Sequence, residues 1–110
     1  MFLKIQTIVT ILLFLVIASS CNLFQSADKC YNKGNDLCKL GKYEEAIKCF
    51  DKAIEIDPKY VGAWYNKGFF LTRMEKIEEA IKCYDKAIEI DPNFADAKTK
   101  KEEILKALGK

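Results

Sequence analysis

The chain has 110 residues, enough for one small domain, and its 18 Lys and Arg against 16 Asp and Glu give a net charge of +2 at pH 7. Acidic and basic residues alternate along it, so no basic stripe of the kind that follows nucleic-acid phosphates is present. It has no histidine, the usual base for a serine or cysteine nucleophile, and no phosphate-binding glycine loop. We therefore expect a protein that is not an enzyme, holds no cofactor and binds no nucleic acid.

Residues 1–20, MFLKIQTIVTILLFLVIASS, have the layout of an export signal peptide: an early lysine, an apolar run, and small residues before Cys21. The sequence Ala18-Ser19-Ser20-Cys21 resembles the lipobox of bacterial lipoproteins, which implies lipidation at Cys21. Residues 21–26 would then form a lipid-anchored tether, and the rest would lie at the cell membrane on its extracytoplasmic side. An uncleaved single-pass signal anchor and ordinary secretion remain alternatives.

The next part of the chain is a tandem repeat. Residues 27–60 align with residues 61–94 without a gap and share 20 identities in 34 positions. A period of this length indicates a solenoid or array. The second half of each copy, EEAIKCFDKAIEIDP at 44–58 and EEAIKCYDKAIEIDP at 78–92, places its apolar residues at helical spacing. Each of these halves is therefore predicted to be an amphipathic helix that ends at its Asp-Pro pair.

The first half of each copy is also predicted to be a helix, despite one interior glycine, Gly34 or Gly68. Glycine inside a helix usually indicates close packing, so these positions are expected to let the paired helix approach. Tight turns are expected at Gly41-Lys42 and at Glu75-Lys76. If the second turn needs a left-handed residue, Glu75 costs about 1 to 2 kcal/mol there, and that turn is expected to be looser than the first.

Residues 95–110, ADAKTKKEEILKALGK, are predicted to form a capping helix. Its narrow apolar side would consist of Ala97, Ile104, Leu105 and Leu108. Two repeats and a cap are near the minimum for a stable stack, because each repeat buries its core only against its neighbours.

Both copies resemble the tetratricopeptide repeat. The first copy matches its signature at Gly34, Leu37, Gly41, Tyr43, Ala46, Phe50, Ala53 and Pro58, and the second at Trp64, Gly68, Leu71, Ala80, Tyr84, Ala87 and Pro92. The resemblance implies an all-α, tetratricopeptide-type helical solenoid with two helix-turn-helix repeats and a C-terminal capping helix. It also implies a concave groove, lined by the first helices, that holds a peptide or a partner's helix. The positions that would line it here are Tyr31, Asn35, Cys38, Lys39, Tyr65, Phe69, Thr72 and Arg73.

Some members of that family clamp a partner's C-terminal carboxylate. Asn35 and Asn66 match two of the clamp positions, but Tyr31 stands where the first lysine would be, so we do not expect a clamp. Phe50, Trp64 and Tyr84 fall on packing positions and are expected in the core.

The four cysteines beyond Cys21 are Cys30, Cys38, Cys49 and Cys83. They are expected to be small buried residues rather than metal ligands, because no CxxC motif is present. A disulfide between Cys38 and Cys49 is kept as an alternative from the sequence.

These features predict a membrane-tethered module that binds a protein or peptide partner in the groove. The alternative is a structural repeat that packs against copies of itself as a homo-oligomer, with no separate ligand. Light scattering over a range of concentrations distinguishes the two, since self-association shifts with dilution.

Overall fold

The computed structural model describes residues 6–12 and 26–110. Residues 6–12 are helical. Residues 1–5 and 13–25 lie outside the described part. They include most of the predicted signal peptide, Cys21 and most of the predicted tether. Among the described residues, no helix has both the length and the apolar character needed to cross a membrane.

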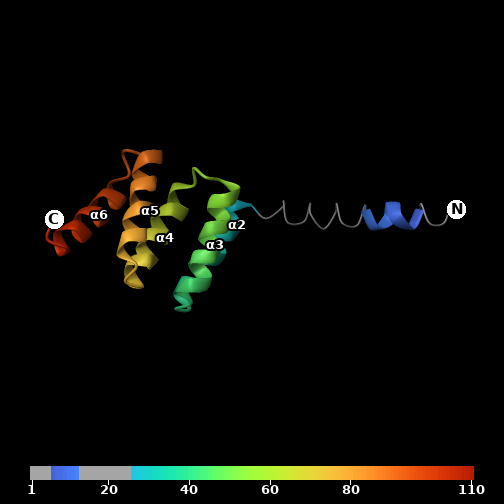
Figure 1. The fold of residues 1–110 in the computed structure, drawn as a ribbon, viewed down its shortest axis with the longest axis horizontal. Helices are drawn as coiled ribbons and strands as arrows, with labels where there is room; N and C mark the ends of the chain where they lie inside the picture. The colour runs from blue at the N-terminus through green and yellow to red at the C-terminus, as the bar shows by residue number, and fades with distance from the viewer. Residues whose placement is uncertain (1–5, 13–25) are drawn as a thin grey trace.

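Five helices follow the tether, and Figure 1 shows them as two antiparallel pairs and a final single helix. The first pair is α2, Ala27–Lys39, with α3, Tyr43–Ile56. The second pair is α4, Val61–Arg73, with α5, Ile77–Ile90, and the last helix is α6, Ala95–Ala107. The described residues contain no strand. The prediction of an all-α helical solenoid is confirmed.

Polar side chains mark the helix boundaries. The Ser26 side chain caps α2 by accepting a hydrogen bond from the Lys29 amide at 3.2 Å. A proline follows the first residue after α3 and after α5 and prevents each helix from continuing. There the Asp57 carboxylate accepts a hydrogen bond from the Lys59 amide, and the Asp91 carboxylate accepts one from the Asn93 amide. The helices therefore end where the Asp-Pro pairs predict.

The turns inside the two pairs have the same geometry. Gly41 has a φ of 76° and Glu75 a φ of 63°, both in the left-handed region. In each turn the next residue donates a hydrogen bond of 2.9 Å back to a helix carbonyl, from Lys42 to Leu37 and from Lys76 to Leu71. The expectation of a looser second turn was wrong, because Glu75 takes up the left-handed conformation and preserves both the turn and its hydrogen bond.

Close approach at the two helical glycines forms the core of each pair. A Cβ atom on Gly34 would lie 2.6 Å from the Phe50 ring, and one on Gly68 would lie 3.0 Å from the Tyr84 ring. Phe50 and Tyr84 are completely buried. The prediction that these glycines admit the paired helix is confirmed, since any larger side chain would push the aromatic ring away.

An ion pair joins each pair of helices to the next one along the chain. Asp51 on α3 contacts Lys67 on α4 at 2.5 Å, and Asp85 on α5 contacts Lys101 on α6 at 2.5 Å. Both residues of the second ion pair occupy the positions, one repeat later, of the residues in the first pair. Helix α6 therefore stacks on α5 in the same way as α4 stacks on α3. The last helix therefore continues the solenoid.

Two core predictions need correction. Trp64 is only half-buried, because its indole N–H donates to the Pro58 carbonyl at 2.9 Å near the surface. In α6, Ala97 and Ile104 are buried, but Leu105 is only half-buried and Leu108, which follows the helix, is 51% exposed.

Candidate functional site

The inner surface of the solenoid contains a cavity between α2, the first turn of α3, and α4. Its volume is about 630 Å³. We call this cavity the first compartment. Its lining residues are Asn35, Cys38, Lys39, Tyr43, Tyr65, Asn66, Phe69, Phe70 and Arg73.

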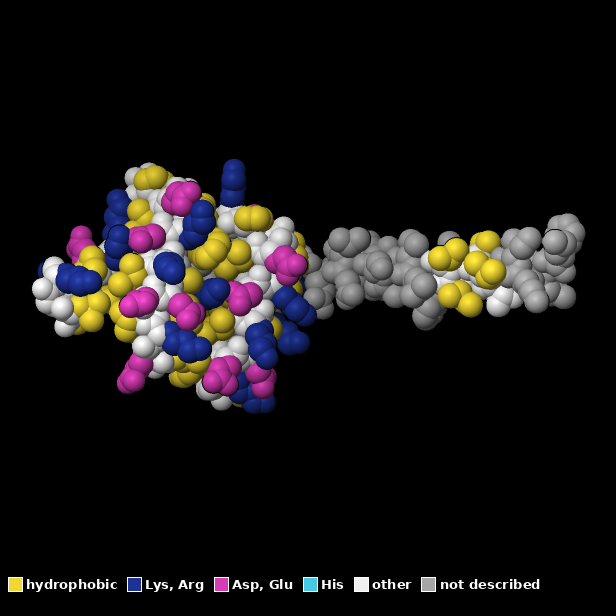
Figure 2. Space-filling model, in the orientation of Figure 1, with side chains coloured by type: hydrophobic (Ala, Val, Ile, Leu, Met, Phe, Trp, Pro, Cys, Tyr) yellow, Lys and Arg dark blue, Asp and Glu magenta, His cyan; other side chains and the backbone are white. Residues whose placement is uncertain are grey.

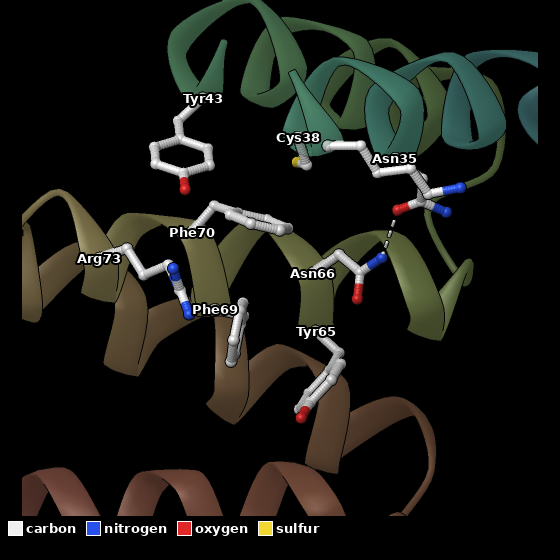
Figure 3. A pocket seen from close by; sticks show the side chains of 9 residues that line it. Asn35, Cys38, Tyr43, Tyr65, Asn66, Phe69, Phe70 and Arg73 are labelled. Atoms are coloured by element: carbon white, nitrogen blue, oxygen red, sulfur yellow. Dashed lines mark hydrogen bonds between the residues drawn. The ribbon is translucent and has the colours of Figure 1, made fainter. Parts of the chain in front are cut away.

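Aromatic rings form the apolar part of the first compartment (Figure 3). Tyr43 of α3 stacks on Phe70 of α4 with 5.3 Å between ring centroids. Phe69 meets Phe70 edge to face at 5.1 Å. These paired rings hold one another in place, and each such pair contributes about 0.5 to 1.5 kcal/mol beyond the area it buries.

The charged groups that line the first compartment are both basic. The Arg73 guanidinium lies over the Phe69 ring at 5.3 Å, a cation–π contact. Lys39 pairs with Asp36 only at 3.9 Å, with both side chains more than three-quarters exposed, and such a contact contributes little. No acidic residue lines the compartment, so its potential is positive.

A hydrogen-bonded group crosses from α2 to α4 at one side of the first compartment. The Asn66 side-chain amide donates to the side-chain oxygen of Asn35 at 2.7 Å, a bond that is drawn as a dashed line in Figure 3. It also donates to the Tyr31 hydroxyl at 3.1 Å. Tyr31 thus supports the asparagines from the side and is not among the lining residues. This leaves the side-chain amide nitrogen of Asn35 and the side-chain oxygen of Asn66 without a hydrogen bond to other described residues.

Tyr65 lies between the first compartment and α6. Its ring packs edge to face on Phe94 at 5.1 Å. Burial raises the pKa of its hydroxyl, and the nearby carboxylates of Asp96 and Glu103 raise it further while Lys100 lowers it. Tyr65 is therefore a neutral hydrogen-bonding group beside the Asp96, Lys100 and Glu103 side chains of α6.

A second cavity, of about 230 Å³, lies between the end of α4, the start of α5, and α6. We call it the second compartment. Its lining residues are Thr72, Ile77, Glu103, Ile104, Ala107 and Leu108. Five of these six correspond, one repeat earlier, to residues that line the first compartment. The groove therefore continues across both repeats, and its chemistry changes from aromatic and basic to aliphatic.

The eight predicted groove residues do not all share one cavity. The first compartment brings together Asn35, Cys38, Lys39, Tyr65, Phe69 and Arg73. Thr72 lies in the second compartment, where its hydroxyl donates to the Gly68 carbonyl at 2.9 Å. Tyr31 lies beside the asparagines as described above.

Three lining residues were missed. Tyr43 was not predicted because only first-helix positions were considered. Phe70 lies on a first helix, next to the predicted Phe69, but outside the four positions per helix that the resemblance implied. Asn66 had been considered only for the carboxylate clamp. The aromatic identity of Tyr43 at the start of α3 was a usable signal.

The cysteines differ in exposure. Cys30 and Cys83 are buried, as predicted, whereas Cys38 and Cys49 are only half-buried. Burial raises the pKa of Cys38 to about 11, with a further contribution from nearby Cys49, and burial raises that of Cys83 to about 11. Both thiols stay protonated at neutral pH, which makes them poor nucleophiles. The described residues contain no cluster of three or more His, Cys, Asp or Glu arranged to hold a metal ion.

Two family models match the chain. A TPR repeat model covers residues 34–74, and a tetratricopeptide repeat model covers residues 61–94. Together they span more than half of the sequence, and they include every residue that lines the first compartment but only Thr72 and Ile77 of the second. A search of curated proteins gave no significant match.

Solved structures include similar chains. The second TPR domain of Spaghetti (RPAP3), bound to the HSP90 peptide SRMEEVD, is 30% identical with a TM-score of 0.73, over 77% of this chain and 79% of that one. A crystal structure of MamA is 27% identical with a TM-score of 0.75, over 76% of this chain and 49% of that one. A second MamA structure is 27% identical with a TM-score of 0.73 and coverage of 76% and 46%. The chain thus spans about half the length of MamA.

Proposed function

Because the chain belongs to the tetratricopeptide repeat family, we propose that it is a non-catalytic interaction module that binds a peptide or protein segment in its inner groove. The observation that carries this proposal is the first compartment, where partly exposed aromatic rings gather on one open surface with two cations, Arg73 and Lys39, of which only Lys39 has an ion pair with another described residue, a long and solvated one. Tyr, Phe and Arg in such a cluster are typical of binding hot spots. The peptide-bound RPAP3 domain, at 30% identity, supports the same function.

We propose that the module lies at the extracytoplasmic face of the cell membrane and is held there by a lipid on Cys21. A single-pass signal anchor is the alternative. What supports it is the sequence of residues 1–21 alone. No more than about five residues, Asn22 to Ser26, separate Cys21 from α2, and fully extended they reach under about 20 Å. The groove would then meet its partner close to the membrane surface.

Co-purification of the full-length protein from its own cells tests the groove. The double variant Phe69→Ala with Arg73→Gln removes an aromatic ring and a cation that are both partly solvent-accessible, so the fold is expected to survive. We expect it to lose the proteins that co-purify with the wild type, by about tenfold or more, because hot-spot residues dominate affinity.

The matched control is Lys48→Gln with Lys82→Gln, which changes two exposed lysines on the second helices, away from the first compartment. The control should keep every partner of the wild type, and circular dichroism should show the same melting temperature for both variants within a few degrees. Undiminished co-purification with the folded Phe69→Ala, Arg73→Gln protein would refute binding through the groove.

A further inference from the structure

The outer side of the first helix pair is open. Figure 1 shows α2 and α3 at one end of the stack, and apart from each other they pack on α4 alone among the described helices. Five of their residues are more exposed than the residues at the same positions of the second pair. These five are Lys33, Leu37, Leu40, Cys49 and Ile56, and their counterparts are Lys67, Leu71, Met74, Cys83 and Ile90.

Three of the five lie along one side of α2. They are spaced four and three residues apart, and residues at that spacing share one face of a helix. The same pattern of a lysine and two large aliphatic residues recurs on α4 and on α6. The three stripes are Lys33, Leu37 and Leu40 on α2, Lys67, Leu71 and Met74 on α4, and Lys101, Leu105 and Leu108 on α6. We call the first of them the open stripe.

The stripe on α4 is covered by α3. Lys67 pairs with Asp51 at 2.5 Å, and Leu71, which is 2% exposed, belongs to the core cluster on which Ile47 packs. Met74 lines one cavity together with these four residues. The residues of α3 that meet the stripe are therefore an isoleucine and, four residues later, an aspartate.

The stripe on α6 meets the same pattern on α5. Asp85 pairs with Lys101 at 2.5 Å, and Ile81, four residues before Asp85, packs against the same core cluster. The fold thus matches a lysine and aliphatic stripe to an isoleucine and aspartate helix twice. These two contacts define the surface that is complementary to such a stripe.

The open stripe has the residues for this contact but has no partner in the described part of the chain. Lys33 takes part in none of the ion pairs found there, and Leu40 is 71% exposed. From these features we infer that the open stripe docks on a helix of another protein, one whose free face carries an aliphatic residue and, four residues later, an aspartate. This interaction surface is separate from the inner groove.

Other occupants fit less well. In a second copy of this chain, the two helices with the complementary pattern are already covered, α3 by α4 and α5 by α6. A lipid or nucleic-acid surface is attracted by a broad field of positive charge. Figure 2 shows acidic and basic side chains intermixed on the visible face of the helical part, and Asp36 lies only three residues from Lys33 on α2. A matched helix supplies both the apolar and the charged contact.

The test measures binding of a helical peptide to the full-length protein by fluorescence anisotropy. The labelled peptide has the sequence of α5, residues 77–90, capped at both ends. A hydrocarbon staple joins positions 79 and 83, opposite Ile81 and Asp85 on the helix, because a free peptide of 14 residues would be marginally helical. Matched peptides carry Asp85→Lys or Ile81→Ser. We expect saturable binding of the parent peptide, and each replacement should weaken it about fivefold to tenfold.

Exchange of the charges assigns the contact to the open stripe. The Lys33→Glu protein should bind the parent peptide about tenfold more weakly and should bind the Asp85→Lys peptide about as tightly as the wild type binds the parent. Leu40→Ser should remove the preference for the parent over the Ile81→Ser peptide. Lys33 and Leu40 are exposed, so both variants keep the fold.

The matched control is Lys39→Glu, which reverses a charge on the same helix but in the first compartment, and it should change neither preference. The Phe69→Ala, Arg73→Gln protein should also bind the peptide like the wild type. A loss of binding in either control would place the peptide in the groove and overturn the inference.

Absence of binding by the parent peptide, or binding that Lys33→Glu leaves unchanged, would also overturn it. So would a failure of the Lys33→Glu protein to bind the Asp85→Lys peptide. Light scattering that shows self-association of the wild type, and its loss in Lys33→Glu, would make the open stripe an interface between copies of this chain instead. None of these results depends on the groove, so the proposed function is tested separately.

Discussion

Glu75 is the non-glycine residue with a positive φ among the described residues, and it occupies the place that Gly41 has in the first turn. A side chain in the left-handed region costs about 1 to 2 kcal/mol, whereas glycine accepts it readily. Glu75→Gly should therefore raise the free energy of unfolding by about 1 kcal/mol, measured as a higher midpoint in urea.

Gly41→Ala is the matched control for this substitution. Gly41 has a φ of 76° and a Cβ there would meet no atom within 4 Å, so the only effect is the backbone conformation. It should lower the midpoint by a similar amount. A Glu75→Gly protein no more stable than the wild type would show that the second turn stores no strain.

Tyr60 predicts how the protein responds to alkali. Its hydroxyl donates a 2.6 Å hydrogen bond to Asp28, and burial, followed by this bond and the Asp28 charge, raises its pKa to about 12. A raised pKa means that the neutral form is stabilised by folding. The contribution of Tyr60 to the free energy of unfolding is therefore complete below the ordinary tyrosine pKa of about 10, and it is lost as the pH rises toward 12.

We therefore expect the melting temperature of the wild type to fall steeply between about pH 10 and 12, and that of Tyr60→Phe to fall less across the same window. Below pH 9 the variant should be less stable by about 0.5 to 1.5 kcal/mol, because it lacks the hydrogen bond to Asp28. Parallel melting curves for the two proteins from pH 9 to 12 would contradict this role for Tyr60.

At the scale of the element, α6 completes the stack. It buries Ala97 and Ile104 against the second pair of helices, and Lys101 pairs with Asp85. Truncation of one buried Ile side chain, such as that of Ile104, costs about 2 to 5 kcal/mol by itself. Each 1 kcal/mol shifts the melting temperature of a domain of this size by about 4 to 8 °C.

A chain truncated after Phe94 should therefore melt at least about 10 °C below the wild type, as followed by circular dichroism at 222 nm. Deletion of Gly109 and Lys110 alone is the control, since it leaves α6 intact and should change the melting temperature by no more than a few degrees. Coincident melting curves for the truncated and full-length chains would exclude a capping role for α6.

At the scale of the whole molecule, the prediction concerns how the folded part is attached. The Ser26 cap begins α2 only five residues after Cys21. Mass spectrometry of the purified protein should show the loss of residues 1–20 and the added mass of two or three acyl chains, the number that stable anchoring needs. Cys21→Ser should remove the added mass and release the protein from the membrane fraction.

Cys49→Ser, a change within the folded part, should alter neither the acyl mass nor the fractionation. An intact N-terminus beginning at Met1 would identify a signal anchor, and a cleaved chain without acyl groups would identify ordinary secretion. Either result would replace the lipid anchor in the proposal.

Much of the fold could be predicted from the sequence because its causes are local. Three features act over only a few residues: the apolar spacing within each helix, the Asp-Pro pairs and the interior glycines. Each of them recurs 34 residues later, in the second copy of the repeat. The two aromatic rings over Gly34 and Gly68 are examples, since the small residue and the ring that fills its space recur at the same offset in both copies.

The division of the groove depended on tertiary structure. Thr72 and Phe69 lie three residues apart on one helix, yet they line different compartments because α2 and α6 pack on opposite sides of α4 and α5. The contact between Asn66 and Asn35 spans 31 residues, and its geometry depends on the offset between two helices. The sequence by itself determined which faces of the helices are buried, since helical periodicity is local. Only the packing of one repeat on the next decided which side chains meet across the groove.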